Sequence, residues 1–245
     1  MKNKRAAKLL NKIVVILGGT SGIGLETAIA AAEEGAKLVV VSSSQQKVDN
    51  SLMSLPISSR GFAVDLTNEM QVIQFFDDIG KFDHLIFTAG DTLNFYNLLS
   101  IDIEQAQESI NLRLWGAIIA VKYGAPLIRE GGSITLTTGA LGKRPRKGSA
   151  VISAMASAIE GLTRSLAIEL EPLRVNAVCA GTVRTNLLSH LTEIEREAFF
   201  DDIGSNLLTR KVGNPRDLAE AYIYLMRCGF ITGQIITVDG GSVLV

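Results

Sequence analysis

Short apolar runs alternate with amphipathic stretches along most of the chain. Runs such as Ile13–Ile16 and Leu38–Val41 are apolar at consecutive positions, which is typical of strands covered by helices on both faces. The stretch that follows the first run, Leu25–Glu34, has one apolar and one polar side, as expected of a helix packed on a sheet. This repeated alternation predicts an α/β protein with a parallel sheet.

The same pattern gives the expected elements and a single domain. The predicted strands span residues 13–17, 37–42, 60–65, 83–87, 133–138, 174–179 and 234–238. The predicted helices span residues 22–34, 45–54, 68–79, about 102–128, 150–170, 187–202 and 215–226. Since the chain shows no internal repeat or low-complexity linker, we predict one Rossmann-like domain over residues 1–245, a doubly wound parallel sheet of about seven strands.

A glycine-rich turn joins the first strand to the first helix. Its sequence is Leu-Gly-Gly-Thr-Ser-Gly-Ile-Gly over residues 17–24. Glycines allow a tight turn and a close approach of the main chain to a pyrophosphate, and the helix dipole favours an anion at that point. We therefore predict a dinucleotide site here, with these contributing residues: Gly18, Thr20, Ser21, Gly22, Ile23 and Gly24.

Composition excludes several other classes of protein. The net charge is −1, with no basic half of the chain, which gives no reason to expect a nucleic-acid partner. Two cysteines without metal-ligand spacing predict neither a disulfide framework nor a metal site. The basic segment 1–12 precedes no apolar signal segment, and the apolar stretch 114–128 is too short for a membrane span. We expect a soluble, cytoplasmic protein that acts on a small molecule.

The end of the second predicted strand bears on the choice of nucleotide. An acidic side chain there favours a free ribose 2′-hydroxyl, whereas this chain has Ser42, Ser43 and Ser44. Three hydroxyl groups can bond a 2′-phosphate and none repels it, so NADP(H) is favoured over NAD(H). The alternative is that these serines only begin the next helix.

Further segments resemble the short-chain dehydrogenase/reductase family over essentially the whole chain. They are the glycine turn, Asn111 in Ser-Ile-Asn-Leu-Arg, the strand 132–138, Gly161–Leu170, Arg174–Val178, Thr232–Gln234 and Val238–Gly241. The resemblance implies hydride transfer between a nicotinamide and a carbonyl or alcohol carbon. It also implies that Asp65, Leu66, Ala89 and Gly90 lie around the adenosine, and that Val183 and Thr185 hold the nicotinamide. Members of this family assemble as homodimers or homotetramers through the fourth and fifth helices, which is expected here too.

The expected catalytic pair is missing. The family places Tyr-x-x-x-Lys on the fifth helix, where residues four apart share a face, and these positions fall on Ile152 and Ala156. No tyrosine or lysine occurs between Gly148 and Ala158, so a shift of alignment does not restore the pair.

Other residues remain as catalytic candidates. Asn111 matches the family's helix asparagine and Thr138 its serine, although Gly139 fits the serine position equally well. Lys143 and Lys147, in the loop before the altered helix, are possible proton donors, with a solvated basic loop as the alternative.

Residues 187–211 are the predicted substrate lid. Their apolar side chains suggest an apolar pocket, although such a stripe is more often part of a core. His190 and Tyr96 lie in segments that can reach a substrate, whereas His84 is expected to be structural or solvated at the far end of the sheet.

These observations favour an NADP(H)-dependent oxidoreductase with a non-standard proton donor, acting on a small carbonyl or an activated C=C bond. The alternative is a non-catalytic, cofactor-binding protein that serves as a sensor or as a partner subunit.

Overall fold

The protein forms seven parallel strands with helices on both faces, as expected from the sequence. The computed structural model describes residues 9–90, 95–185 and 191–245. The strands are β1 Ile13–Leu17, β2 Lys37–Ser42, β3 Arg60–Ala63, β4 Phe82–Phe87, β5 Ile128–Gly139, β6 Arg174–Ala180 and β7 Ile235–Val238. Their order in the sheet is β3-β2-β1-β4-β5-β6-β7.

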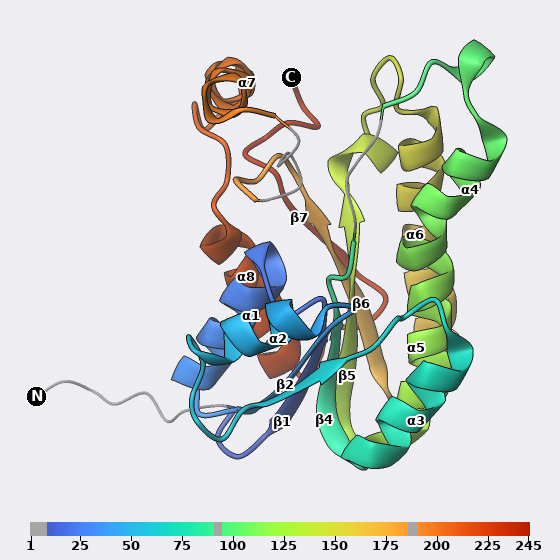
Figure 1. The fold of residues 1–245 in the computed structure, drawn as a ribbon, viewed down its shortest axis with the longest axis vertical. Helices are drawn as coiled ribbons and strands as arrows, with labels where there is room; N and C mark the ends of the chain where they lie inside the picture. The colour runs from blue at the N-terminus through green and yellow to red at the C-terminus, as the bar shows by residue number, and fades with distance from the viewer. Residues whose placement is uncertain (1–8, 91–94, 186–190) are drawn as a thin grey trace, which may run out of the picture.

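Eight α-helices in the described part of the chain cover the sheet. They are α1 Gly22–Glu33, α2 Gln45–Leu52, α3 Glu69–Ile79, α4 Ile103–Ile110, α5 Gly116–Gly124, α6 Ala150–Glu169, α7 Glu193–Asn206 and α8 Pro215–Arg227. Figure 1 shows α1, α2 and α8 on one face of the sheet and α3, α5 and α6 on the other. The helix α7 lies beyond the carboxyl ends of the strands, outside both layers (Figure 1).

The strand order reverses direction between β1 and β4. The chain moves outward from β1 to β2 and β3, then returns to pair β4 with the other side of β1. Ligands of open α/β sheets bind outside the carboxyl ends of the strands at such a reversal. Here that point is formed by Leu17 and Phe87, which are paired in the register of β1 and β4.

The core follows from the apolar runs. One buried cluster packs between the sheet and α3, α5 and α6, and the other packs between the sheet and α1 and α8. Consecutive strand residues such as Val14 and Val15 serve opposite clusters, because neighbouring side chains of a strand point to opposite faces.

The single long helix predicted at about 102–128 is wrong. The structure divides it into α4, a π-helical turn η2 (Asn111–Trp115), α5 and a short 3₁₀ turn η3 (Ala125–Leu127). Pro126 lacks the amide hydrogen that a continuing α-helix needs, so α5 ends before it. β5 then begins at Ile128, earlier than predicted.

The helix predicted at 187–202 is shifted. α7 begins at Glu193, where Thr192 caps it by accepting a hydrogen bond from the Glu195 amide, and it continues to Asn206. Residues 186–190 of this predicted helix, and residues 1–8 of the basic N-terminal segment, lie outside the described residues.

Among the described helices, α6 alone is long and apolar enough to span a bilayer by length and composition. It contributes Ile152, Met155 and Ile159 to the core cluster beside β5 and β6. A helix that covers a sheet inside a folded domain passes the same test, so this finding is weak evidence for a membrane span.

Candidate functional site

The glycine turn is held in place by close contacts of the main chain. Gly18 has φ +87°, and a Cβ on it would lie 2.5 Å from the Ala89 nitrogen. A Cβ on Gly24 would lie 2.1 Å from the Gly18 oxygen and 2.5 Å from Thr88 Oγ1. Side chains at these two positions are therefore sterically excluded, as the predicted phosphate-binding turn requires.

Thr88 ties the turn to the end of β4. Its hydroxyl lies 3.1 Å from the Leu17 oxygen and 3.3 Å from the Gly18 oxygen, and it donates toward both. The Thr88 amide also donates to the Leu17 oxygen at 2.8 Å. The threonine therefore supports the turn that begins at the end of β1.

The N-terminus of α1 is open to an anion. Its cap residue Ser21 makes no side-chain capping bond, and the first turn holds no acidic residue. By contrast, α2, α3 and α4 are capped by the side chains of Ser44, Asn68 and Asp102. Because uncapped amides and the helix dipole both favour negative charge, this helix end fits a pyrophosphate.

Thr185 lies across the same turn. A Cβ on Gly22, where φ is +50°, would lie 3.3 Å from Thr185 Cγ2. The Arg184 amide donates to the Gly213 oxygen and the Gly213 amide to the Thr182 oxygen, and Val183 is bridged to Gly213. Val183 and Thr185 are thus on a segment that is fixed near the predicted phosphate site.

The three serines after β2 are used in part by the protein itself. Ser44 Oγ accepts a hydrogen bond from the Lys47 amide at 3.4 Å, which makes it the cap of α2. Ser42 Oγ accepts from the Ser44 amide at 3.5 Å, and Ser43 is exposed. The alternative, that the serines begin the next helix, is confirmed for Ser44, while the contact of the serines with a 2′-phosphate stays a prediction. Acceptance of these bonds leaves the hydroxyl hydrogens of Ser42 and Ser44 for another acceptor.

Asp65 and Leu66 lie beyond the end of β3. Asp65 is exposed and its Oδ1 accepts bonds from the Thr67 amide at 2.9 Å and the Thr67 hydroxyl at 2.7 Å. Leu66 is buried, and its side chain packs in the core cluster. The contact of Asp65 with the adenosine, which the family resemblance implies, stays a prediction.

Thr138 is engaged by α6. Its hydroxyl donates its only hydrogen to the Ala156 oxygen at 2.9 Å, and the residue is buried. In this arrangement Thr138 has no hydrogen left for a substrate oxygen, contrary to the role predicted for it. Gly139 next to it has open space, since a Cβ there would meet only the Ala180 oxygen at 3.9 Å.

The positions of the missing pair are part of the core. Ile152 and Ala156 are 9% and 1% exposed, and neither side chain can exchange a proton. Asn111 is exposed at the junction of α4 and η2, and its predicted role stays a prediction.

The basic loop before α6 reaches the last strand. Lys143 Nζ donates to Thr237 Oγ1 at 2.7 Å, which ties the loop to β7, while Lys147 is exposed. Among the described residues, no group of three or more His, Cys, Asp or Glu side chains is arranged to hold a metal ion.

Residues 18–243 match the family described as enoyl-(acyl carrier protein) reductase. The short-chain dehydrogenase/reductase ATR9 of Stachybotrys chlorohalonatus is 37% identical over 246 residues, 94% of this chain and 96% of that protein. The protein is a short-chain dehydrogenase/reductase.

Two solved structures of this family are close to it in fold. A small-chain dehydrogenase in complex with NADPH has a TM-score of 0.86 and 35% identity, covering 96% of this chain and 100% of that one. The MalC reductase/Diels-Alderase of Malbranchea aurantiaca has a TM-score of 0.90 and 29% identity, covering 98% of this chain and 100% of that one.

The predicted lid of this short-chain dehydrogenase/reductase has its own small core. Phe200, Leu207 and Val212 are buried together, and Phe199 stacks edge-on against Phe200. The apolar side chains of α7 therefore pack in this small core, in addition to any pocket that they line. Leu187 and Leu188 of the predicted lid, and the candidate His190, lie outside the described residues.

A cavity of about 370 Å³ lies beside α7. Arg184 and Asp201 line it together with Arg210 and Lys211, so it carries charges of both signs. Arg184 is paired with Glu197 at 2.5 Å and lies over the Phe200 ring at 4.8 Å. These contacts hold Arg184, on the segment after β6, against α7.

Tyr96 and His84 have different surroundings. The Tyr96 hydroxyl is buried without a hydrogen bond to any described residue, and its main-chain amide donates to the Gly148 oxygen at 2.9 Å. His84 Nδ1 lies 2.8 Å from Ser133 Oγ in the buried amino-terminal part of β4. Burial, helped by the positive charges of Arg174 and Lys12, lowers the His84 pKa to about 4. The structural role expected of His84 is confirmed.

One charged residue near the carboxyl end of β4 was not predicted from the sequence to lie there. Arg113, in η2, lies with its guanidinium against the Gly90 main chain, where a Cβ would be 2.3 Å from Nη1. Its position in a helix of mixed polarity gave no signal of this contact. Gly90 and Arg113 are 23 residues apart in the sequence, so only folding brings them together.

Proposed function

We propose that this short-chain dehydrogenase/reductase is an NADP(H)-dependent reductase of small carbonyl compounds or activated C=C bonds, with a non-standard proton donor. The observation that carries the proposal is the glycine turn: the Gly18 and Gly24 contacts exclude side chains, and the end of α1 is uncapped. Bound nicotinamide would supply the hydride.

The preference for NADP(H) is supported by the serines after β2. Ser43 is exposed, and no acidic residue stands beside it between Ser42 and Lys47. The related dehydrogenase solved with NADPH supports the same choice. A 2′-phosphate would meet hydroxyl groups and the main chain rather than a carboxylate.

The absence of an acidic group at two positions of α6 supports the proposed substrate classes. Ile152 and Ala156 supply no acid, so the proton must come from water or from another side chain. Reduction of a polarised C=C bond tolerates this loss, because the anion that forms can take its proton from water. The family description as an enoyl reductase favours the same class.

The experiment is a calorimetric titration with NADPH and with NADH, on the wild type and on Ser43→Asp. We expect micromolar binding of NADPH to the wild type and a loss of about 10-fold or more in the variant, because a carboxylate repels the 2′-phosphate. NADH binding should be unchanged or stronger in Ser43→Asp. Failure of the wild type to bind either nucleotide would refute the proposed function.

Binding without turnover would identify the non-catalytic alternative. NADPH-loaded protein is mixed with a panel of enones and ketones, and nicotinamide absorbance is followed under single-turnover conditions. Tight NADPH binding together with no oxidation by any member of the panel would support a sensor or partner subunit.

We also propose that the protein is a homo-oligomer that pairs through α6. Its outer face carries small exposed residues at helical spacing, namely Ala154, Ser157, Ala158 and Gly161, which allow close approach of another helix. A Cβ on Gly161 would have no atom of this chain within 4 Å. Gly161→Glu should therefore fold normally and shift light-scattering mass to that of a monomer, whereas an unchanged mass would place any interface elsewhere.

A further inference from the structure

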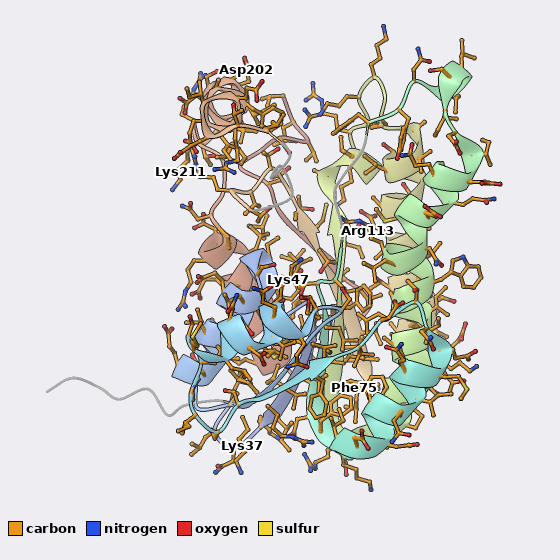
Figure 2. All side chains as sticks on the ribbon, in the orientation of Figure 1. Lys37, Lys47, Phe75, Arg113, Asp202 and Lys211 are labelled. Atoms are coloured by element: carbon orange, nitrogen blue, oxygen red, sulfur yellow. The ribbon has the colours of Figure 1, made fainter. Side chains whose placement is uncertain are left out.

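A tyrosine of α8 is buried against the sheet on the face that carries α1 and α8. Tyr222 is 0% exposed and packs in the core cluster of that face. Phe75, labelled in Figure 2, belongs to the cluster on the opposite face. Burial raises the pKa of the Tyr222 hydroxyl, so this group keeps its proton at neutral pH. A hydroxyl buried in this way needs a hydrogen-bond partner.

The partner of Tyr222 is Thr137, near the carboxyl end of β5. The two hydroxyl oxygens are 2.6 Å apart, and Thr137 Oγ1 is also 2.6 Å from the Phe87 carbonyl oxygen. Because a carbonyl oxygen can only accept, Thr137 gives its one hydrogen to Phe87, and Tyr222 donates to Thr137. Both hydroxyl groups are therefore oriented along one path, from α8 through β5 to β4.

The Thr137 hydroxyl links β5 to β4 beyond the last residue pair of their register. That pair is Ile86 and Thr135, whereas β5 stays paired with β6 for several residues more. Phe87 follows Ile86 and is paired on its other side with Leu17 of β1. The Thr137 side chain thus holds Phe87 at the point where the strand order reverses.

The path continues through the main chain into the glycine turn. The Phe87 oxygen and the Thr88 amide belong to one peptide group, and that amide donates to the Leu17 oxygen at 2.8 Å. The Leu17 oxygen and the Gly18 amide belong to another peptide group, and this amide donates to the Val41 oxygen at 2.9 Å. Hydrogen bonds arranged in such a chain polarise and strengthen one another. One chain of hydrogen bonds therefore runs from α8 across β5, β4 and β1 to β2, through the first residues of the turn.

The glycine turn has little room to adjust independently of β4. Gly18 packs so closely on the segment after β4 that a Cβ on it would lie 2.5 Å from the Ala89 nitrogen. A shift of the Phe87–Thr88 peptide therefore moves the turn with it. The amides at the start of α1, which directly follow the turn, then no longer point at one common position for a pyrophosphate.

We propose that Tyr222 and Thr137 are positioning residues for the dinucleotide, which hold the glycine turn in its anion-binding geometry through the Phe87–Thr88 peptide. The proposal rests on the proposed function, since it concerns the same nucleotide site. Neither hydroxyl group belongs to the turn, so both act on the nucleotide through the main chain. A phenylalanine would fill nearly the same volume as Tyr222, so core packing alone does not require the hydroxyl.

The test is a calorimetric titration with NADPH, combined with urea denaturation of each variant. Tyr222→Phe and Thr137→Val remove one hydroxyl each at nearly constant volume, and Thr137→Ser keeps the hydroxyl. The matched control is Thr135→Val, two residues earlier on β5 and so on the same face of the sheet. Its hydroxyl is buried without a hydrogen bond to any described residue. Leu225→Ala, at a buried position of α8, is the control for a loss of stability alone.

We expect Thr137→Val to weaken NADPH binding by about 10-fold, since it removes the bond to the Phe87 oxygen. Tyr222→Phe acts one link further away and should weaken binding by about 5-fold. Thr137→Ser and Thr135→Val should stay within about 2-fold of the wild type. Because the two hydroxyl groups act in series, the double variant should bind NADPH no more weakly than Thr137→Val alone. Leu225→Ala should lower the urea midpoint and leave NADPH affinity unchanged.

Three results would overturn the inference. They are an unchanged NADPH affinity in folded Thr137→Val, an equal loss of affinity in Thr135→Val, and additive losses in the double variant. If Thr137→Val does not fold, Tyr222→Phe decides, since it keeps the ring that fills the core. A lower urea midpoint with wild-type NADPH affinity would then assign Tyr222 to stability alone. Failure of the proposed function is seen separately, as the absence of nucleotide binding by the wild type.

Discussion

The two ends of the parallel sheet differ in how their polar groups are hydrogen-bonded. At the amino end, Asp83 accepts hydrogen bonds from Lys12 Nζ at 2.9 Å, from the Ile13 amide at 2.8 Å and from Arg129 Nη1 at 3.1 Å. At the carboxyl end, the Gly18 turn packs directly on the Ala89 main chain and α1 begins without a side-chain cap.

The amino end stabilises the fold, whereas the carboxyl end is the proposed nucleotide site. At the amino end, Arg174 also donates to the Leu225 and Met226 oxygens in the last turn of α8, which satisfies carbonyl groups that a helix end leaves unpaired. These contacts hold buried charged groups of the sheet with partners inside the protein. The carboxyl end has the uncapped amino end of α1, which favours an anion, so mutations at the two ends should separate stability from binding.

The largest effect on stability is expected at Asp83. Burial would raise its carboxyl pKa, but the Ile13 amide and the charges of Lys12 and Arg129 hold that pKa below its ordinary value. Asp83→Ala leaves these donors without their acceptor and should lower the free energy of unfolding by roughly 3–5 kcal/mol. Urea denaturation measures this loss, Asp83→Asn should lose less, and NADPH affinity of the folded variants should not change.

His84 should make stability depend on pH. Its pKa is about 4 in the folded protein and about 6.5 in the unfolded chain, so between these values only the unfolded chain takes up the proton. Stability should therefore fall as pH drops from about 6.5 to about 4, by about 3 kcal/mol in all. Urea midpoints measured across this range should be flatter in His84→Asn; equal slopes in both proteins would contradict the assignment.

Gly24→Ala tests the carboxyl end. The new Cβ would lie 2.1 Å from the Gly18 oxygen, so the turn must shift. We expect NADPH affinity to fall by roughly 100-fold, which is somewhat under 3 kcal/mol. Calorimetry provides the measurement, and an affinity within a few-fold of the wild type would show that the turn does not hold the nucleotide.

The matched control is Gly161→Ala, at a helical glycine with open space around its Cβ position. It should leave NADPH affinity unchanged and raise the free energy of unfolding by up to about 1 kcal/mol, because alanine favours the helix. A destabilised Gly161→Ala variant would indicate a contact that only an assembled form contains.

Much of the fold and part of the site could be predicted because the signals are local. Apolar runs and amphipathic stretches gave the seven strands, and β1 and β2 have the predicted bounds. The predicted helix at about 102–128 failed because the pattern of apolar residues does not distinguish an α-helix from one that includes a π-turn and ends before Pro126.

The sequence by itself determined the parallel α/β architecture, the glycine turn and the absence of a Tyr-Lys pair from α6, because each of these is set by residue type and short spacing. Only the tertiary structure decided that the Thr138 hydrogen is given to the Ala156 carbonyl and that the Arg113 guanidinium lies on Gly90. These contacts join different elements, and their geometry depends on how a strand, a loop and a helix pack together. The chemistry of the site therefore follows from packing, which local sequence patterns do not encode.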